Sequence, residues 1–595
     1  MAYLKLPSLR NKPYLRHMNK RWKKRDAAKE EIVLLLMSEL NIGRTLASLL
    51  VQRDVKDLES AKRFFRPQLN DLHDPFLMKD MDLAVTRLQD ALESGERILV
   101  YGDYDVDGTT AVTLVFSFLK NIGASCEFYI PDRYEEGYGF SFRGVDFAAS
   151  EGITLIITLD CGIKDTEKIV YAKQKGIDVI ICDHHNPDQI PPAYAVLDPK
   201  RPDCAYPYKG LSGCGVGFKL LQAWCLKRDY PMEALFEYLD LLTISIGADI
   251  VPITGENRVL AHYGLQQIGL KKRPGIEAML FQSGFKKPGL NITDVVFVLA
   301  PRINAAGRIF SGMQAVQLLL SETIESALKI SPALEENNNQ RKHLDKEITK
   351  EAVEQVLSDP KHVEKFSIVV YSETWHKGVV GIVASRLVET FYKPTIVLVK
   401  DGNKLTGSAR SIDGVDLFDA LSACSSFLEK FGGHTMAAGL TLCVDNLEAF
   451  KAAFDLEISS ILHQQMPIQQ IEYDAEIDFN EVDEKFHRIL RQFGPFGPGN
   501  MNPVFLARQV VNDKFTRTVG DTNAHLKLHI KQKKSSNKTL DGIAFNLGEW
   551  SEHLLLGGEA DILFTLEENE YRGNVTLQLN VKDMRESVVH EVSQG

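Results

Sequence analysis

Short apolar runs that alternate with helical patterns constrain the fold of this chain more than any other feature. Residues 97–101, 155–159 and 179–182 are rich in Leu, Ile and Val without strict alternation, which is typical of strands buried on both faces. A helical pattern over 109–119 lies between the first two of these runs. Because parallel strands are joined by helical crossovers, the pattern predicts an α/β domain with a mostly parallel sheet and helices on both faces.

A polar segment in the middle of the chain predicts a long connecting helix. Residues 331–360 hold few apolar side chains and are bracketed by Pro332 and Pro360. A helix of about 40 Å with mostly polar faces is typical of a bridge between domains. A second α/β region is expected over 361–460, where residues 367–371 have the composition of a buried strand.

Residues 465–595 show a third pattern, in which apolar and polar side chains alternate. Segments such as 504–510 and 574–581 have a period of two, and turns rich in Gly, Pro and Asn separate them, most clearly at residues 494–500. Short alternating strands with such turns predict a small β-barrel, and an OB-fold is the expected type. The predicted fold is therefore a multidomain α/β chain that ends in a barrel.

The charge of the chain is unevenly distributed. A net charge of −11 points away from nucleic acid, but residues 1–25 hold nine Lys or Arg and no acid. They belong to a basic N-terminal segment over 1–55, which precedes the first α/β domain, expected over 56–330. A second basic run contains Lys527, Lys531, Lys533, Lys534 and Lys538. Each cluster is compatible with solvated surface and with a patch that binds phosphates.

Cysteine usage and hydropathy indicate a cytoplasmic protein. The eight Cys are scattered and form no CxxC pair, which is typical of reduced thiols and speaks against a zinc ribbon. No apolar stretch approaches the roughly 18 residues that a membrane-spanning helix needs. No apolar segment follows the basic start, so a secretory signal is not expected either.

The most specific local feature is the sequence GDYDVDG at residues 102–108, where the first predicted strand ends. Asp103, Asp105 and Asp107 bring three carboxylates within five residues. Such a group is strongly self-repelling in a partly buried site unless cations share the space. For this cluster alone, an exposed acidic turn is an equally good interpretation.

Two further predicted strands end in the same kind of residue. Asp160 follows one of them directly, and Asp183, His184 and His185 follow the other. Because the carboxyl ends of parallel strands meet at one edge, we expect these side chains to converge. Adjacent histidines in an extended chain point in opposite directions, so one can bind a metal ion while the other reaches a substrate oxygen. Asp249 ends another apolar stretch and is expected to add a carboxylate at such a strand end.

The types of these side chains narrow the choice of metal. Several carboxylates with a single imidazole and no Cys favour Mn²⁺ or Mg²⁺ over a structural zinc ion. Two such ions, roughly 3.5–4 Å apart and bridged by one carboxylate, form the clamp used for phosphoester hydrolysis. The sequence therefore predicts metal-assisted hydrolysis of a phosphodiester or phosphomonoester.

These motifs resemble those of the DHH phosphoesterase superfamily, which are matched in order by Asp105-Val106-Asp107, Asp160, Asp183-His184-His185 and Asp249. Three longer runs extend the resemblance over nearly the whole chain: PRINAAGR at 301–308, HKGVVGIVASR at 376–386 and FGGHTMAAG at 431–439. Within the superfamily the chain resembles more closely the RecJ family of bacterial single-strand-specific 5′→3′ DNA exonucleases. This resemblance implies a DHH domain, a DHHA1 substrate-binding domain and a C-terminal OB-fold that binds nucleic acid.

The resemblance also implies a division of labour among the acidic residues. One metal ion is assigned to Asp107, Asp160, His184 and Asp249. The second is assigned to Asp103, Asp105 and Asp160. Asp160 would then bridge the two ions, and His185 would contact the scissile phosphate and stabilise the transition state.

Substrate-binding residues are implied in the same way. Arg133, Ser408 and Arg410 would form a pocket for a 5′-terminal phosphate, for which a hydroxyl and guanidinium groups are well suited. Gly432, Gly433 and His434 would allow the backbone to approach a phosphate or base closely, with a tight turn before a helix as the alternative. Arg302, Asn304 and Arg308 would touch the strand near the metal ions, with an Asn cap flanked by structural arginines as the alternative.

The expected function is therefore that of a single-stranded-DNA-specific exonuclease, degrading DNA 5′→3′ to mononucleotides in repair and recombination. The expected partners are single-stranded DNA with a free 5′ end, a single-strand-binding protein and a helicase. A DHH enzyme acting on short oligoribonucleotides, 3′-phosphoadenosine phosphate or a cyclic dinucleotide is the first alternative, although such enzymes need no C-terminal barrel. A non-catalytic scaffold that binds single strands is the second, and it predicts eroded metal ligands, whereas every expected Asp and His is present.

Overall fold

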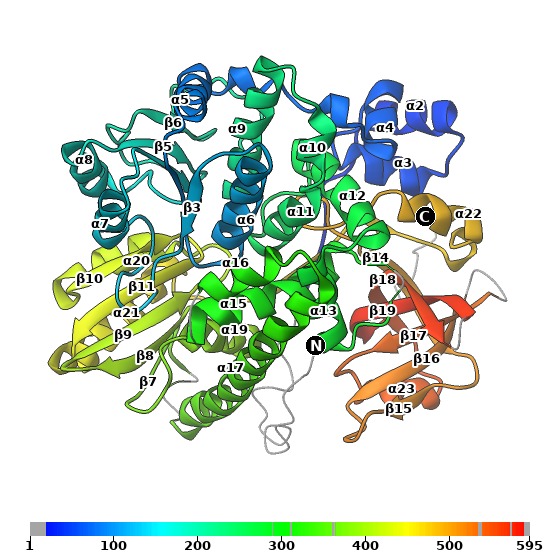
Figure 1. The fold of residues 1–595 in the computed structure, drawn as a ribbon. Helices are drawn as coiled ribbons and strands as arrows, with labels where there is room; N and C mark the ends of the chain where they lie inside the picture. Colours follow the sequence, from blue (N-terminus) through cyan, green and yellow to red (C-terminus); the bar gives the residue numbers. More distant parts are fainter. Residues whose placement is uncertain are drawn as a thin grey trace.

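The computed structural model describes residues 20–587 except for 288, 310–311, 360–361, 363, 534–537 and 572–573. Two α/β regions lie one above the other on one side of the molecule, and a β-barrel lies on the other side (Figure 1). Among the helices of these described residues, none is long and apolar enough to cross a membrane.

The first α/β region contains a five-stranded sheet in the order β3-β2-β4-β5-β6, and every pair is parallel. Its strands are β2 (Ile98–Gly102), β3 (Cys126–Tyr129), β4 (Leu155–Leu159), β5 (Asp178–Cys182) and β6 (Ala195–Leu197). The chain leaves β2 to add β3 on one side and returns to add β4 on the other. The β2/β4 boundary is therefore the topological switch point, where ligands of open α/β sheets bind.

Helices cover both faces of this sheet, as the sequence predicts. Ile98 and Val100 of β2 point to the face that is covered by α5 (Met81–Glu93), α6 (Val106–Asn121) and α9 (Gly213–Lys227). Leu99 and Tyr101 point to the opposite face, which is covered by α7 (Phe142–Ser150) and α8 (Thr166–Gln174). The prediction of a mostly parallel sheet between two helical layers is confirmed.

A helical region follows the sheet and leads into the long connecting helix. It contains α11 (Leu239–Ala248), α12 (Gly255–Leu270), α13 (Pro274–Ser283), α15 (Ala300–Ile309) and α16 (Gly312–Leu319). The connecting helix α17 spans Ile324–Ser358, about 50 Å, and begins earlier than the expected residue 331. It begins there because the side chain of Thr323 caps it by accepting a hydrogen bond from the Ser326 amide. Pro332 consequently lies inside the helix rather than at its start.

The second α/β region is a mixed sheet in the order β10-β11-β9-β8-β7. Its elements are β7 (Ile368–Ser372), α19 (Val380–Phe391), β8 (Thr395–Asp401), β9 (Lys404–Arg410), α20 (Leu417–Ala423), β10 (Lys430–His434), β11 (Ala437–Cys443) and α21 (Leu447–Ile461). Gly432 and Gly433 lie in β10 and pair with Gly439 and Ala438 of β11. They are therefore part of an edge hairpin and do not form a turn that precedes a helix.

The C-terminal region is a closed β-barrel, which confirms the predicted OB-like fold. Its strands are β14 (Phe505–Asn512), β15 (Arg517–Val519), β16 (His525–Gln532), β17 (Thr539–Ala544), β18 (Ala560–Tyr571) and β19 (Asn574–Glu586). Pairings run from β14 through β18, β19 and β17 to β16, and an additional β14–β16 pairing closes the five-stranded ring.

The N-terminal segment packs onto this barrel rather than standing apart. The strand β1 (Arg21–Lys24) pairs in parallel with β12 (Gln470–Tyr473), and the helices α2 (Glu30–Leu40), α3 (Arg44–Val51) and α4 (Leu58–Phe65) share one apolar core with the barrel strands. Figure 1 shows these blue helices beside the ochre helix α22 (Glu484–Arg491).

Several residues of the two basic clusters form local ion pairs. In the N-terminal cluster, Lys20 pairs with Asp583 at 3.6 Å and Arg25 pairs with Asp474 at 3.0 Å. In the C-terminal run, Lys531 pairs with Asp513 at 2.8 Å. Residues 1–19 and Lys534, which belong to these clusters, lie outside the described residues.

Candidate active site

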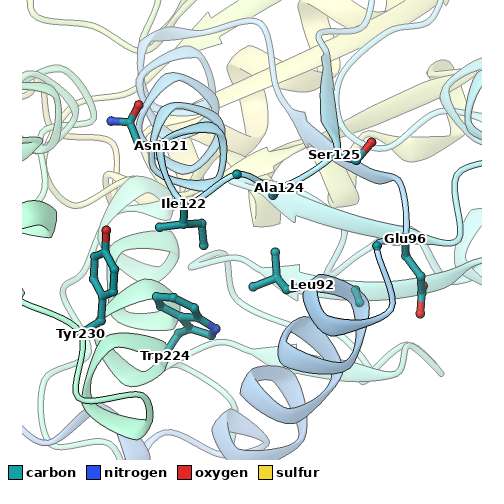
Figure 2. Close-up of a pocket in the computed structure, with 11 residues that line it drawn as sticks. Leu92, Glu96, Asn121, Ile122, Ala124, Ser125, Trp224 and Tyr230 are labelled. Atoms are coloured by element: carbon teal, nitrogen blue, oxygen red, sulfur yellow. The ribbon is translucent and has the colours of Figure 1, made fainter.

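A hollow of about 630 Å³ lies at the edge of the first sheet where its strands begin. Leu92, Ile122, Trp224 and Tyr230 give it apolar walls (Figure 2). Its larger polar groups are already engaged: the Asn121 amide donates to the Tyr238 hydroxyl, and the Trp224 indole donates to Gln89. The hollow therefore offers little that would orient a ligand, and the candidate chemistry lies at the opposite edge.

The three aspartates of the acidic sequence lie between the end of β2 and the first turn of α6. Asp105 caps α6, and its carboxylate accepts a hydrogen bond from the Gly108 amide at 3.0 Å. Asp103 and Asp107 are buried. A Cβ on Gly108 would lie 2.3 Å from the carbonyl oxygen of Asp103, so only glycine allows the loop to fold back this tightly.

Three donors that the sequence did not single out fix the carboxylate of Asp107. The Gly213 and Cys214 amides donate at 2.7 and 2.9 Å, and the Ser245 hydroxyl donates at 2.7 Å. The two amides belong to the first turn of α9, where unpaired N–H groups favour a carboxylate. The glycine-rich sequence at 213–217 is the signal that could have pointed to this role.

The residues that follow β4 and β5 meet next to this loop. Asp160 adopts a left-handed backbone conformation with φ of 59°, which is uncommon for residues other than glycine. Asp183 accepts hydrogen bonds from the backbone amides of His184 and His185, and its carboxylate lies 2.7 Å from Nδ1 of His185. Asp183 therefore holds both residues in place, but the two rings do not point in opposite directions as predicted. Their centres lie 4.7 Å apart, and Nε2 of His184 and Nδ1 of His185 both approach Oδ1 of Asp160, at 3.2 and 3.9 Å, because β5 ends before the two histidines.

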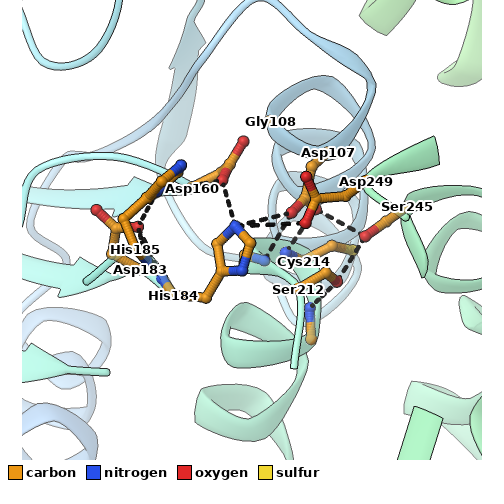
Figure 3. A network of polar contacts seen from close by, with 12 residues as sticks. Asp107, Gly108, Asp160, Asp183, His184, His185, Ser212, Cys214, Ser245 and Asp249 are labelled. Carbon is orange, nitrogen blue, oxygen red and sulfur yellow. Dashed lines mark hydrogen bonds and ion pairs between the residues drawn. The ribbon is translucent and has the colours of Figure 1, made fainter. Parts of the chain in front are cut away.

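Three of the predicted carboxylates converge on one atom, Nε2 of His184 (Figure 3). The nearest carboxylate oxygens lie at 3.2 Å for Asp160, 3.5 Å for Asp249 and 3.8 Å for Asp107. The prediction that Asp249 follows a strand is wrong, because Asp249 directly follows the helix α11. The end of this helix nevertheless brings Asp249 to the edge of the sheet.

The acidic residues around His184 are crowded and largely buried, and a bound cation would stabilise their negative charge. Burial and neighbouring carboxylates raise the pKa of Asp103, Asp105 and Asp160, and they raise the pKa of Asp249 to about 9. Burial lowers the pKa of His184 to about 4. Without another charge at the site, burial therefore favours the protonated form of these acids and the neutral form of the imidazole.

Buried polar atoms without hydrogen-bond partners also indicate a cation site. Among the described residues, Oδ2 of Asp103 and both ring nitrogens of His184 are buried and have no hydrogen-bond partner. Such atoms in a native structure call for an ion or water. The carboxyl groups of Asp105 and Asp160 interact directly, so Asp160 stands between the His184 group and the β2 loop. Carboxylates and one imidazole suit Mn²⁺ or Mg²⁺, and the residues present fit this pair of ions.

His185 is held from both sides. Burial lowers its pKa, but the hydrogen bond with Asp183 and the negative charges of Asp183 and Asp105 together outweigh this effect and raise the pKa overall. The Tyr138 hydroxyl lies 3.3 Å from Nε2 of His185, and the two rings meet edge to face. The sequence did not single out Tyr138. The Tyr138 ring is placed beside the acidic cluster by tertiary packing, which cannot be predicted from a single sequence.

A pocket of about 420 Å³ lies between the two α/β regions. Its lining includes five of the predicted substrate-binding residues: Arg133, Ser408, Arg410, Gly432 and Gly433. The Arg410 guanidinium donates to the Ser408 hydroxyl at 2.7 Å, and Arg133 lies 4.9 Å from the Tyr104 ring centre. The sequence missed Gly381, where a Cβ would lie 2.9 Å from Nη2 of Arg410 and would crowd the pocket.

The remaining predicted substrate residues lie elsewhere. Arg302 is buried and pairs with Glu335 of α17 while donating to the Val298 carbonyl at 2.6 Å. Its guanidinium thus joins two helices, and the predicted contact of Arg302 with a DNA strand stays a prediction. Asn304 is half-buried on α15. The side chain of Arg308 lies outside the described residues, and His434 lies outside the pocket lining.

Three family models match the chain. They are described as the DHH family, N-terminal domain, over residues 97–246, the DHHA1 domain over 364–460 and the RecJ OB domain over 473–583. Among curated proteins, the single-stranded-DNA-specific exonuclease RecJ of Bacillus subtilis (strain 168) is 37% identical over 559 residues. The match covers 93% of this chain and 69% of that relative.

Solved structures give the same likeness. The crystal structure of RecJ from Thermus thermophilus in complex with Mn²⁺ matches with a TM-score of 0.81 at 27% identity, covering 96% of this chain and 80% of that chain. The Mg²⁺ complex of that protein matches with a TM-score of 0.75 at 26% identity, covering 96% and 79%. The similarity thus extends over both α/β regions and the barrel.

Proposed function

Because the chain belongs to the RecJ family of single-stranded-DNA-specific exonucleases, we propose that it hydrolyses the phosphodiester bonds of single-stranded DNA from the 5′ end. The products would be mononucleotides. The observation that carries this proposal is the convergence of Asp107, Asp160 and Asp249 on Nε2 of His184. A divalent-cation site of this kind beside a pocket with two arginines fits a phosphodiesterase.

The acidic residues would hold two divalent cations, Mn²⁺ or Mg²⁺. The first would take its ligands from Asp107, Asp160, His184 and Asp249. The second would take its ligands from Asp103, Asp105 and Asp160. When bound, such a pair activates water and stabilises negative charge on the phosphoryl oxygens. Support comes from the unpartnered buried atoms of Asp103 and His184 and from the raised pKa values of the carboxyl groups.

His185 would stabilise the phosphate during the reaction. Asp183 accepts the hydrogen bond of its Nδ1, so Nε2 faces the space in front of the acidic cluster, where Tyr138 now contacts it. A protonated imidazole in this position can donate to a phosphoryl oxygen as negative charge develops there. The raised pKa of His185 favours that protonated form.

The pocket between the α/β regions would hold the 5′-terminal phosphate and thereby set the polarity of digestion. Arg410 and Ser408 already bond to each other, and Arg133 faces them from the first domain. Guanidinium groups bind phosphate through paired hydrogen bonds. Cleavage beside an anchored 5′ end proceeds from that end, and the C-terminal barrel would bind the following nucleotides.

The experiment that tests this proposal is a digestion assay with end-labelled DNA. The protein is incubated with 5′-phosphorylated single strands, with duplex, and with small nucleotides including a cyclic dinucleotide, in Mn²⁺, Mg²⁺ or EDTA. We expect mononucleotides from the 5′ end of the single strand only, and no product in EDTA. Preferential hydrolysis of the small nucleotides would identify a small-substrate DHH enzyme instead, and digestion from the 3′ end would contradict the assigned pocket.

The protein partners and the compartment are proposals that follow from this substrate. A helicase would supply single strands, and a single-strand-binding protein would meet the enzyme on them during repair and recombination. We also propose a cytoplasmic location, which is supported by the eight cysteines, all of them free thiols.

A further inference from the structure

The loop at residues 494–500 has a Gly- and Pro-rich sequence that the proposed function does not use. It connects α22 to β14 in the C-terminal region, yet it packs against residues 252–254 of the DHH domain, which follow Asp249 in the chain. The backbone amide of Ile253 donates a hydrogen bond to the carbonyl oxygen of Pro498 at 2.7 Å. The loop thus touches the chain four residues after a side chain of the acidic site.

Two glycines make this contact close. A Cβ on Gly497 would lie 2.5 Å from Cγ1 of Ile253, and a Cβ on Gly499 would lie 2.9 Å from Cγ2 of Thr254. Side chains other than hydrogen would therefore push the loop and the turn apart. Gly499 also has a φ of 74°, in the region that favours glycine.

The turn that follows Asp249 has an unusual backbone conformation. Ile250 has a φ of 59°, which is rare for a β-branched residue, and its side chain is 65% exposed. Its own packing therefore does not hold the conformation. The residues that follow Ile250 are fixed by other parts of the molecule. The Pro252 carbonyl accepts from the Tyr208 hydroxyl and from the Asn257 amide, both at 3.0 Å, and the next amide, that of Ile253, donates to Pro498 of the loop.

The loop is rigidly built before it meets the turn. Asn500 is buried, and its side-chain amide donates to the carbonyls of Phe493 and Pro495 at 2.8 and 2.9 Å. Its side-chain oxygen accepts from Nε of Arg53 at 2.7 Å. Arg258 of α12, the helix that follows the turn, donates to the Phe493 carbonyl at 2.8 Å. Bonds therefore run from the loop to both neighbouring parts of the molecule.

We propose that the 494–500 loop is a positioning element that holds Asp249 in place to bind a divalent cation. The loop keeps the turn after α11 in its left-handed conformation, and this conformation directs the Asp249 carboxylate toward His184. The C-terminal region thereby controls the metal affinity of the DHH domain. The inference rests on the proposed role of Asp249 as a ligand.

The direct test is the full-length variant Gly497→Ala, whose new methyl group must displace Ile253. We expect its Mn²⁺ affinity, measured by electron paramagnetic resonance without DNA, to fall about tenfold or more. Loss of a residue that holds a metal ligand in place typically weakens metal binding by this amount. Single-strand binding in EDTA should stay unchanged, and cleavage should recover at excess Mn²⁺. Gly43→Ala is the matched control, because no atom lies within 4 Å of its added Cβ and its φ of −69° suits alanine.

An Asp249→Ala variant in the same titration separates the possible failures. Weaker Mn²⁺ binding in Asp249→Ala together with unchanged binding in Gly497→Ala overturns the positioning role. Unchanged binding in both variants overturns it as well, by removing Asp249 from the ligands. Failure of the proposed exonuclease function would give a different result. DNA would then remain intact, while Gly497→Ala would still weaken Mn²⁺ binding.

Hydrogen exchange of the unmodified protein provides a second measurement that needs no folded Gly497→Ala variant. If the loop and the turn act together, Mn²⁺ slows exchange in peptides that cover 250–254 and 494–500. The effect on the loop should disappear in Asp249→Ala. Exchange of the loop that is the same with and without Mn²⁺ would overturn the inference.

Discussion

Asp103 and His184 each bury polar atoms that nothing in the described part of the chain satisfies. A buried polar atom without a partner is costly, and here the cost is concentrated at one edge of the first sheet. Asp107, by contrast, accepts three hydrogen bonds and is fixed in place. The acidic site therefore combines one carboxylate that hydrogen bonds fix in place with several whose charge the protein does not neutralise, which is the arrangement expected of a metal site.

Replacing Asp160 tests the bridge between the two proposed ions. Asn tolerates the left-handed backbone at this position, so Asp160→Asn removes the charge with little strain. We expect cleavage of single-stranded DNA to fall by more than the roughly 10–100-fold typical of residues outside the ligand shell. Binding of the strand, measured by fluorescence anisotropy, should persist. Turnover near that of the exposed control Asp90→Asn would exclude a bridging role.

Replacing the pocket residues tests the 5′-phosphate site. The double variant Ser408→Ala and Arg410→Ala removes a charge-assisted contact worth about 1.5–3 kcal/mol, or roughly 10–100-fold in binding. Only ends that carry a phosphate should lose this contribution. The measurement compares kcat/KM on strands with 5′-phosphate and 5′-hydroxyl ends. Equal losses on both ends would mean that the pocket binds another part of the strand.

At the scale of elements, the features that depend on neighbouring residues in the sequence could be predicted. The strands β2, β4 and β5 and the acids that follow them were predictable, because apolar strands and their carboxyl ends are adjacent in sequence. Asp249 was assigned to a strand since nine of the ten residues of α11 are buried, and a run buried on all sides has no period that separates helix from strand.

Supports that depend on tertiary contacts could not be predicted. Ser245 and Gly213 bond to Asp107 from 138 and 106 residues away, and no local pattern marks such a pair. The polar helix α17 was predicted, but its polar side chains are less solvated than expected. Asp345 is buried and forms an ion pair with Arg386 of α19, and Glu335 forms an ion pair with Arg302 of α15.

The pair formed by Arg302 and Glu335 provides a prediction about stability. Arg302→Met leaves the Glu335 carboxylate without its partner, which we expect to cost about 2–3 kcal/mol of unfolding free energy. The double variant Arg302→Met and Glu335→Met should regain part of this loss. Urea denaturation measures both. If Arg302→Met instead weakens strand binding at unchanged stability, the original prediction of a substrate contact is right.

At the scale of the whole molecule, the two ends of the described chain form one structural unit. The helices α2 to α4 share an apolar core with the barrel, and β1 pairs with β12. Arg258 of the DHH domain and Arg53 of the N-terminal segment both bond to the loop region that precedes β14. Truncation at either end would therefore disturb the surroundings of the acidic site.

Metal binding should stabilise the folded molecule. At a free concentration about 100 times the dissociation constant, each Mn²⁺ ion that binds only the folded state adds about 2.7 kcal/mol. We expect Mn²⁺ to raise the thermal midpoint and EDTA to reverse the shift, as measured by scanning calorimetry. Asp160→Asn should show a clearly smaller shift. A midpoint that does not respond to Mn²⁺ would mean that the acids do not form a cation site.

The most direct test of the central assignment is anomalous diffraction from crystals grown with Mn²⁺. Two manganese peaks are expected at the carboxyl edge of the first sheet, one in contact with Asp107, His184 and Asp249 and the other on the Asp103 side, with Asp160 touching both. No peak at this edge, or a single ion that leaves Asp160 without metal contact, would contradict the two-ion site from which the proposed hydrolysis follows.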